Sequence, residues 1–206
     1  LVDISLPIDT NNKWSVINFL NNENDDYFSI NTYLENGSVG VSVTKLKDNF
    51  ELDNSFGSGG HVSQLFTNTS IQKIIKSSIY DNKLYLLTQN SKDQQISFSV
   101  YTLDLNNPQN FVSLFELTSE FSTSSNYFSK DFIVNSDGVF VGGTTDDSDP
   151  SVGFGARTYD HFVSHFFLNG SINSDFANNG VFQKDFGDTD KATALAIQSD
   201  GKILIA

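Results

Sequence analysis

The sequence has no cysteine and no methionine among its 206 residues. Without cysteine the chain has no disulfide bonds, thiol catalysis or thiolate metal sites, and its redox compartment is left undetermined. Basic residues are also few: 12 lysines and arginines stand against 25 aspartates and glutamates, a net charge of −13. Because this charge repels phosphate backbones and anionic headgroups, nucleic acid and acidic membranes are poor candidate partners.

Long apolar runs are absent as well. No run approaches the roughly 18 residues that a membrane-spanning helix needs, so membrane insertion is not expected. The chain opens at Leu1 without a basic-then-apolar leader, which is consistent with a mature form or an excised piece. Hydrophobic residues make up 38% of the chain, enough for a packed core. We therefore expect residues 1–206 to form a single repeat domain or a fragment of a larger one.

An internal repeat is visible in the sequence. The segment Leu52–Val62 returns as Ile172–Phe182, which places Phe176 120 residues after Phe56. A second landmark is an acidic turn followed by an apolar strand, with spacings of 56, 56 and 63 residues, at Asp25, Asp81, Asp137 and Asp200. The period is therefore near 60 residues, and about three and a half copies are expected, at 1–56, 57–112, 113–176 and an incomplete 177–206.

Apolar residues alternate with polar ones inside each period, as in Val39-Gly-Val41-Ser-Val43 and Ile96-Ser-Phe98-Ser-Val100. This alternation is typical of half-buried strands, whereas helical periodicity is not sustained anywhere. Asn-Gly and Asp-Gly pairs divide the chain into roughly four short strands per period; they end at Gly37, Gly138, Gly170 and Gly201. The pattern predicts an all-β fold of the β-propeller type with four-stranded antiparallel blades, as a partial propeller.

The segments Val163–Val181 and Ala194–Ala206 resemble the delta-60 repeat of bacterial surface and secreted proteins. That family's pattern is a strand, then D-G-S-L-D-x-x-F-G-x-x-G, then a strand, then Q-x-D-G-K-I-L-V-A-G. The last 45 or so residues match closely, Val43–Phe66 matches moderately, and Ala177 replaces the first glycine of the motif. The resemblance implies a propeller-type architecture and an extracellular or cell-surface location, and it supplies no catalytic residues.

Gly60 and Gly180 occupy corresponding positions of a tight turn, where a positive φ is expected. We expect Phe56 and Phe176 to be buried beside them. Ala177 stands where the first copy has Gly57, which indicates that this position tolerates a Cβ. Phe56-Gly-Ser-Gly-Gly60 is not interpreted as a phosphate loop, because it opens no helix and lacks the Lys-Ser/Thr of a Walker loop.

Clusters of acidic residues are the one feature of the sequence that points to a chemical site. Asp188 and Asp190 follow an expected strand end at Phe186, and the equivalent place one double period earlier carries Asn68 and Ser70. Oxygen ligands on a loop suit calcium, so a calcium site at Asp188 and Asp190 is one hypothesis. Ordinary solvated turns are the alternative, since Asp, Asn and Ser are common turn residues. Asp146–Asp149 and Asn22–Asp26 are further acidic segments of this kind.

Catalytic patterns are weak. The chain has no G-x-S-x-G nucleophile elbow, and its three histidines are scattered. His161 and His165 lie on one expected strand, about 13 Å apart, so they cannot share one metal ion. We expect all three, with His61, to be partly exposed strand or turn residues. The 19 phenylalanines favour core packing, while Trp14 and the tyrosines leave a sugar-stacking surface open.

Two functional classes follow. The favoured one is a non-catalytic propeller segment of a larger bacterial extracellular or cell-surface protein, acting as scaffold or adhesion module, with the rest of the polypeptide or another protein chain as partner. The alternative is a carbohydrate-binding or glycan-active propeller. Closed propellers have four to eight blades, so we also expect these residues to be part of a longer polypeptide, with an edge strand open at Lys202–Ala206. The missing strands would be supplied by the continuation of the same chain or by a neighbouring copy.

Overall fold

The computed structural model describes residues 14–66, 71–92, 95–117, 126–146, 159–187 and 191–206. Every regular element in these ranges is a β-strand, and all strand pairs are antiparallel. The all-β expectation is therefore confirmed. The strands form three four-stranded sheets and one two-stranded sheet.

Each four-stranded sheet is a meander in which strands adjacent in sequence are adjacent in space. The first sheet contains β1 (Trp14–Asn21), β2 (Tyr27–Glu35), β3 (Ser38–Leu46) and β4 (His61–Leu65). The second contains β5 (Ile71–Tyr80), β6 (Lys83–Lys92), β7 (Gln95–Asp104) and β8 (Val112–Leu117). The third contains β9 (Asn126–Asn135), β10 (Gly138–Asp146), β11 (Tyr159–Phe166) and β12 (Val181–Lys184), and the fourth pairs β13 (Leu195–Ile197) with β14 (Ile203–Ile205).

The acidic landmarks mark the same place in every sheet. Asp25, Asp81, Asp137 and Asp200 each lie in the turn just before the second strand, which is β2, β6, β10 or β14. At Asp81 the turn has two residues, and Asp81 and Asn82 have φ of 48° and 53°, a pattern that matches the right-handed twist of a hairpin. The repeat boundaries inferred from the sequence at 56, 112 and 176 fall before or at the start of β4, β8 and β12.

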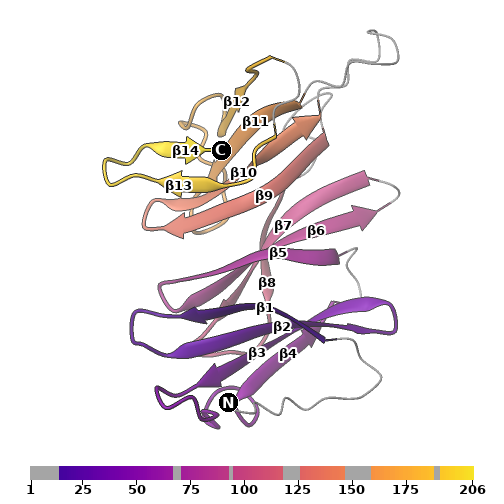
Figure 1. Cartoon of the computed structure of the whole chain (residues 1–206), viewed down its shortest axis with the longest axis vertical. Coiled ribbons are helices and arrows are strands. Elements are labelled where there is room, and N and C mark those ends of the chain that lie inside the picture. Colours follow the sequence, from indigo (N-terminus) through magenta and orange to yellow (C-terminus); the bar gives the residue numbers. More distant parts are fainter. Residues whose placement is uncertain (1–13, 67–70, 93–94, 118–125, 147–158, 188–190) are drawn as a thin grey trace.

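Successive sheets pack face to face along the long axis of the molecule (Figure 1). Val41 and Val43 on β3 lie in one apolar core with Leu84 and Leu86 on β6. The opposite face of β6, which includes Tyr85, packs on the third sheet. Because side chains alternate between faces, β6 contributes to both cores.

The first strands of the sheets form a continuous line of contacts, from β1 to β5, from β5 to β9 and from β9 to β13. Asp131 on β9 joins three of these strands. Its Oδ1 accepts a bond from Lys76 Nζ on β5, and its Oδ2 accepts one from the Leu195 backbone N–H on β13, at 2.9 Å. Asp131 is 7% exposed. Because an unpaired charge in such a buried place would cost free energy, these hydrogen bonds stabilise the carboxylate.

Candidate functional site

The two copies of the turn before the fourth strand have the same backbone geometry. Gly60 and Gly180 both have φ of 92°, the positive value expected from the sequence. The Gly60 N–H donates to the Phe56 carbonyl at 2.9 Å, and the Gly180 N–H donates to the Phe176 carbonyl at 2.8 Å. The glycines are also sterically enclosed, since a Cβ on Gly180 would lie 2.3 Å from Ile172 Cγ1. Glycine is therefore required here for both conformation and space.

Gly57, which the second copy replaces with Ala177, does not tolerate a Cβ as that replacement would suggest. Gly57 has φ of 56°, and Ala177 at the equivalent position has φ of 48°. The site does hold a Cβ in the second copy, but only in the left-handed conformation, which costs an L-residue about 1–2 kcal/mol. In the first copy a Cβ on Gly57 would lie 2.4 Å from the His61 carbonyl oxygen. The turn of the second copy therefore accepts a Cβ at this position, whereas the turn of the first copy does not.

The two motif phenylalanines are not equally buried. Phe56 is 4% exposed and packs edge-on against Phe28 at 5.7 Å. Phe176 is only half-buried, against Phe140 and His165. The expectation that both are buried is thus wrong for Phe176. The cause is its surroundings: the core that buries Phe56 includes apolar residues of β7, whereas the sheet beside Phe176 has two described strands.

His165 is buried, contrary to the expectation that all three histidines are partly exposed. It is 7% exposed and stacks on Phe140 at 4.0 Å. The Asn173 amide donates to its Nδ1 at 3.1 Å, and its Nε2–H donates to the Asp137 carbonyl at 3.0 Å. This pattern corresponds to a neutral imidazole with both nitrogens bonded.

The equivalent pair in the first copy is ionic. Lys45 and Asp53 lie 120 residues before His165 and Asn173, and the Lys45 Nζ to Asp53 Oδ2 distance is 3.4 Å. Hydrogen bonds from Ser55, together with Lys45, hold the pKa of Asp53 below its ordinary value. The same position thus carries an ion pair in the first copy and a neutral hydrogen bond in the second. We therefore assign Lys45, Asp53, His165 and Asn173 a structural role in stabilising the turn.

Gly138 and Gly201 take part in the hairpins at the second strands. Both have positive φ, 141° at Gly138 and 81° at Gly201. A Cβ on Gly138 would lie 2.1 Å from the Phe166 carbonyl oxygen, whereas one on Gly201 would meet nothing within 4 Å. Gly138 therefore has a packing requirement that Gly201 lacks.

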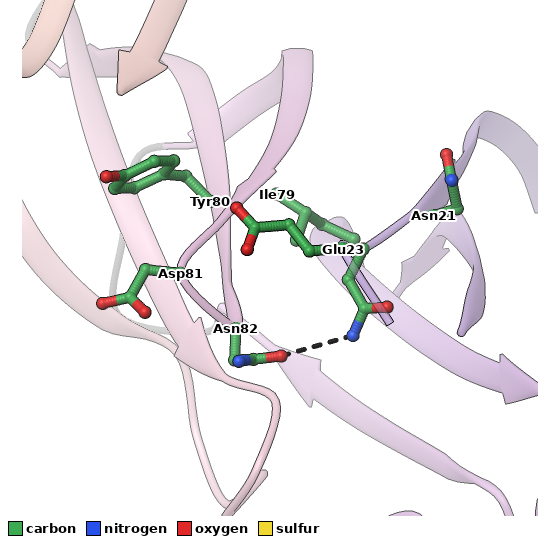
Figure 2. Close-up of a pocket in the computed structure, with 7 residues that line it drawn as sticks. Asn21, Glu23, Ile79, Tyr80, Asp81 and Asn82 are labelled. Carbon is green, nitrogen blue, oxygen red and sulfur yellow. Dashed lines mark hydrogen bonds between the residues drawn. The ribbon is translucent and has the colours of Figure 1, made fainter. Parts of the chain in front are cut away.

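A polar pocket of about 240 Å³ lies where the β1–β2 hairpin meets the β5–β6 hairpin. Figure 2 shows its lining. The pocket is lined by Asn21, Asn22, Glu23, Ile79, Tyr80, Asp81 and Asn82. The Asn22 amide donates to Asn82 Oδ1 at 3.3 Å, and this is the dashed bond in Figure 2. Two acidic residues, three asparagines and a tyrosine therefore contribute to the lining of one small cavity.

A partly exposed aromatic cluster lies beside the β1–β2 hairpin, and we define it as Phe19 on β1, Tyr27 on β2 and Phe50 from the loop between β3 and β4. The Phe19 and Tyr27 rings stack at 5.8 Å, and the Phe50 ring lies 5.1 Å from that of Tyr27. Phe19 is 46% exposed and Phe50 is 42% exposed. Tyr27 pairs across the hairpin with Asn21, which lines the polar pocket. The cluster and the pocket therefore share the β1–β2 hairpin, but Leu20, between Phe19 and Asn21, packs into the core with the second sheet, so the Phe19 side chain points to the opposite face of β1.

Phe50, one of the three residues of the aromatic cluster, has an unfavourable left-handed backbone conformation. Its φ is 63°, and the equivalent residue of the second copy is Gly170, with φ of 87°. The two turns share their hydrogen bonds, from Phe50 N to Lys47 O and from Gly170 N to Phe167 O, each at 2.9 Å. Strained residues of this kind are concentrated at functional sites. The replacement of glycine by phenylalanine is visible once the repeat is aligned, and sequence reasoning missed it.

The calcium hypothesis falls on Asp188 and Asp190, which lie outside the described residues. Within the described ranges, no three His, Cys, Asp or Glu residues are grouped as metal ligands. Asn22, from one of the other acidic segments, has a structural role: its Oδ1 accepts from the Asp26 N–H at 2.9 Å. His61 and His161 are half-buried.

In the described part of the chain, no helix is long and apolar enough to cross a membrane. The chain matches no protein-family model, no curated protein and no solved structure.

Proposed function

We propose that these residues are a non-catalytic β-propeller-type segment of a larger bacterial extracellular or cell-surface protein, and that the segment acts as a scaffold or adhesion module. Each four-stranded sheet is one blade, and β13 and β14 begin a further blade. The partners in this proposal are the rest of the polypeptide or another protein chain, which meet the segment at its sheet faces and edges.

The observation that carries the proposal is the regular arrangement of the sheets. First strands contact first strands from β1 to β13, as the inner strands of successive blades do around an axis. The acidic landmark precedes the second strand in all four sheets. Repeats of one unit that bury apolar faces against their neighbours are the physical basis of repeat scaffolds. The delta-60 resemblance supports the bacterial surface location.

A screen of immobilised extracellular proteins and glycans tests the scaffold role. The purified chain is applied at increasing concentration, and the retained ligand is then analysed by mass spectrometry. A scaffold or adhesion module should bind saturably and leave its ligand chemically unchanged. A ligand that acquires a new mass after incubation with the chain, with turnover proportional to chain concentration, would contradict a non-catalytic role.

The aromatic cluster favours a second candidate, which is carbohydrate binding. Phe19 and Phe50 are exposed aromatic side chains of the kind that stack on sugars, and the amides and carboxylates that line the pocket at the β1–β2 hairpin suit sugar hydroxyls. Glu23 and Asp81 line that pocket, so a glycan-active site would be located there. The strain at Phe50 is the specific feature that an ordinary turn does not need.

Phe50→Gly is the variant that separates the two candidates. It removes the ring and also relieves the left-handed strain of about 1–2 kcal/mol, so the fold should be retained. On a glycan array, a sugar-binding site predicts loss of at least tenfold in affinity for this variant. The matched control is Phe167→Ser, which removes a 43% exposed aromatic from the equivalent turn of the second copy. Equal binding by both variants and the native chain would exclude the aromatic cluster as the site.

A further inference from the structure

Three asparagines in the sequence directly precede a glycine, in the pairs Asn36-Gly37, Asn169-Gly170 and Asn179-Gly180. Asparagine is one of the chemically labile residues of proteins, because the backbone nitrogen of the next residue can attack its side-chain amide carbon. Glycine leaves that nitrogen most accessible, since it has no Cβ. All three pairs lie among the described residues, so their surroundings can be compared.

Hydrogen bonds hold both members of the Asn169-Gly170 pair. The Asn169 Oδ1 accepts from the Ser171 N–H at 3.0 Å and from the Ser171 hydroxyl at 2.7 Å. The Gly170 N–H donates to the Phe167 carbonyl at 2.9 Å. A Cβ on Gly170 would lie 2.3 Å from the Leu114 carbonyl oxygen, so the turn is also closely packed. The side-chain amide and the attacking nitrogen must therefore both leave existing hydrogen bonds before they can react.

The Asn179-Gly180 pair is held at its glycine. Asn179 is exposed, but Gly180 is buried, and its N–H donates to the Phe176 carbonyl at 2.8 Å. Losing a buried backbone hydrogen bond costs free energy. Attack by the Gly180 nitrogen requires that loss, so this pair is also protected.

The Asn36-Gly37 pair has neither restraint. Both residues are exposed and form the two-residue turn between β2 and β3, with φ of 50° and 79°. Within the described ranges, no hydrogen-bond partner is found for the Asn36 side chain or for the Gly37 N–H. A Cβ on Gly37 would meet nothing within 4 Å. The tip of this hairpin can therefore rearrange without first breaking a hydrogen bond of the reacting groups.

We propose that Asn36 is a site at which the chain modifies itself. The Gly37 nitrogen attacks the Asn36 Cγ, and a carbon–nitrogen bond forms between them. The Asn36 amide nitrogen takes up the proton lost by the Gly37 N–H and leaves as ammonia, which gives a cyclic succinimide. Water then opens the ring at either carbonyl and yields aspartate or β-linked isoaspartate. The reaction is independent of what the segment binds.

The isoaspartate product lengthens the backbone of the β2–β3 turn by one carbon atom. This turn sets the register in which Tyr33 pairs with Gly40. Tyr33 is 8% exposed, and a Cβ on Gly40 would lie 2.1 Å from the Tyr33 ring, so the ring lies close against the Gly40 backbone. The modification should therefore add a negative charge and loosen the central hairpin of the first sheet.

The test is incubation of the native chain in mildly alkaline buffer, with peptide mapping by mass spectrometry at intervals. Conversion of amide to acid should be at least tenfold faster at Asn36 than at Asn169, although both stand in an Asn-Gly-Ser sequence. In urea strong enough to unfold the chain, the two rates should become similar, because the difference arises from the folded turns.

Three variants test the chemistry and its consequence. Gly37→Ala should slow conversion of Asn36 at least tenfold, because a Cβ shields the attacking nitrogen. The matched control is Gly59→Ala, which places alanine at another open position of positive φ and should leave that rate unchanged. Asn36→Asp carries the new charge without the longer backbone and should keep the native melting temperature, whereas the isolated isoaspartate form should melt at a lower temperature.

Equal rates at Asn36 and Asn169 in the folded chain would overturn the inference. A rate difference of the same size in urea would also overturn it, because the folded turns would then have no part in it. An isoaspartate form that melts with the native chain would contradict the loosening of the β2–β3 hairpin.

Discussion

The turn glycines offer the sharpest test of how the repeat is held together. Gly59 and Gly60 are neighbours in one turn, and both have positive φ, 61° and 92°. A Cβ on Gly60 would lie 2.5 Å from Leu52 Cγ, whereas a Cβ on Gly59 would meet nothing within 4 Å. Gly60→Ala therefore combines conformational strain with a steric overlap, and Gly59→Ala introduces the strain alone.

The expected magnitudes follow from these two contributions. A left-handed alanine costs about 1–2 kcal/mol, and overpacking a core site costs about 1–3 kcal/mol. Gly60→Ala should therefore lower the free energy of unfolding by about 2–5 kcal/mol, and Gly59→Ala by about 1–2 kcal/mol. The second copy supports the smaller value, because Asn179 occupies the position of Gly59 with φ of 50°.

Urea denaturation followed by tryptophan fluorescence and circular dichroism measures both variants. A loss of about 3 kcal/mol corresponds to roughly 6–12 °C in the melting temperature of a domain of this size. Repeating the measurement in a Leu52→Ala background should remove most of the difference between the two variants. Equal destabilisation by Gly59→Ala and Gly60→Ala in the native background would show that the overlap with Leu52 has no energetic consequence, contrary to this prediction.

Three further predictions follow from individual residues. Asp131→Ala should destabilise the chain by about 2–3 kcal/mol, because it leaves the Leu195 N–H without its charged acceptor; faster exchange of the Leu195 amide would be the direct sign, and unchanged exchange would contradict it. Ala177→Gly should stabilise by up to about 1 kcal/mol by relieving the left-handed alanine, so a lower melting temperature would count against that strain. The pKa of Asp53 is lowered by Ser55 and Lys45, so the contribution of Asp53 to stability is present above the unfolded pKa of about 4 and is lost as pH falls below it. The difference in unfolding free energy between the native chain and Asp53→Asn should therefore shrink below about pH 4. A difference that stays constant with pH would contradict this role of Asp53.

Local patterns were sufficient to predict the strands and several turns. The alternation at Val39–Val43 appears as β3, and the turns at Asp81 and Asp137 precede β6 and β10. The reason is that strand alternation and hairpin turns depend on residues close in sequence. The left-handed conformations of Gly60 and Gly180 follow from the same local chemistry.

Contacts between distant residues account for what sequence reasoning missed. His165 is buried because it stacks on Phe140 from the neighbouring strand, and no local pattern indicates that contact. The aromatic cluster joins Phe19 to Phe50 across the first sheet. The unequal burial of Phe56 and Phe176 arises from a neighbouring sheet rather than from the motif itself. Such packing depends on how sheets are placed, which residue spacing does not specify.

Pairwise spin-label distances test the proposal that successive sheets are arranged as blades around an axis with their first strands innermost. The chain has no cysteine, so labels attach only at introduced sites. One pair joins the first strands through Lys73→Cys on β5 and Lys130→Cys on β9; the other joins the fourth strands through Glu116→Cys on β8 and Lys184→Cys on β12. Double electron–electron resonance should give a clearly shorter separation for the first-strand pair than for the fourth-strand pair. Equal separations, as in a flat stack of parallel sheets, would contradict the proposal.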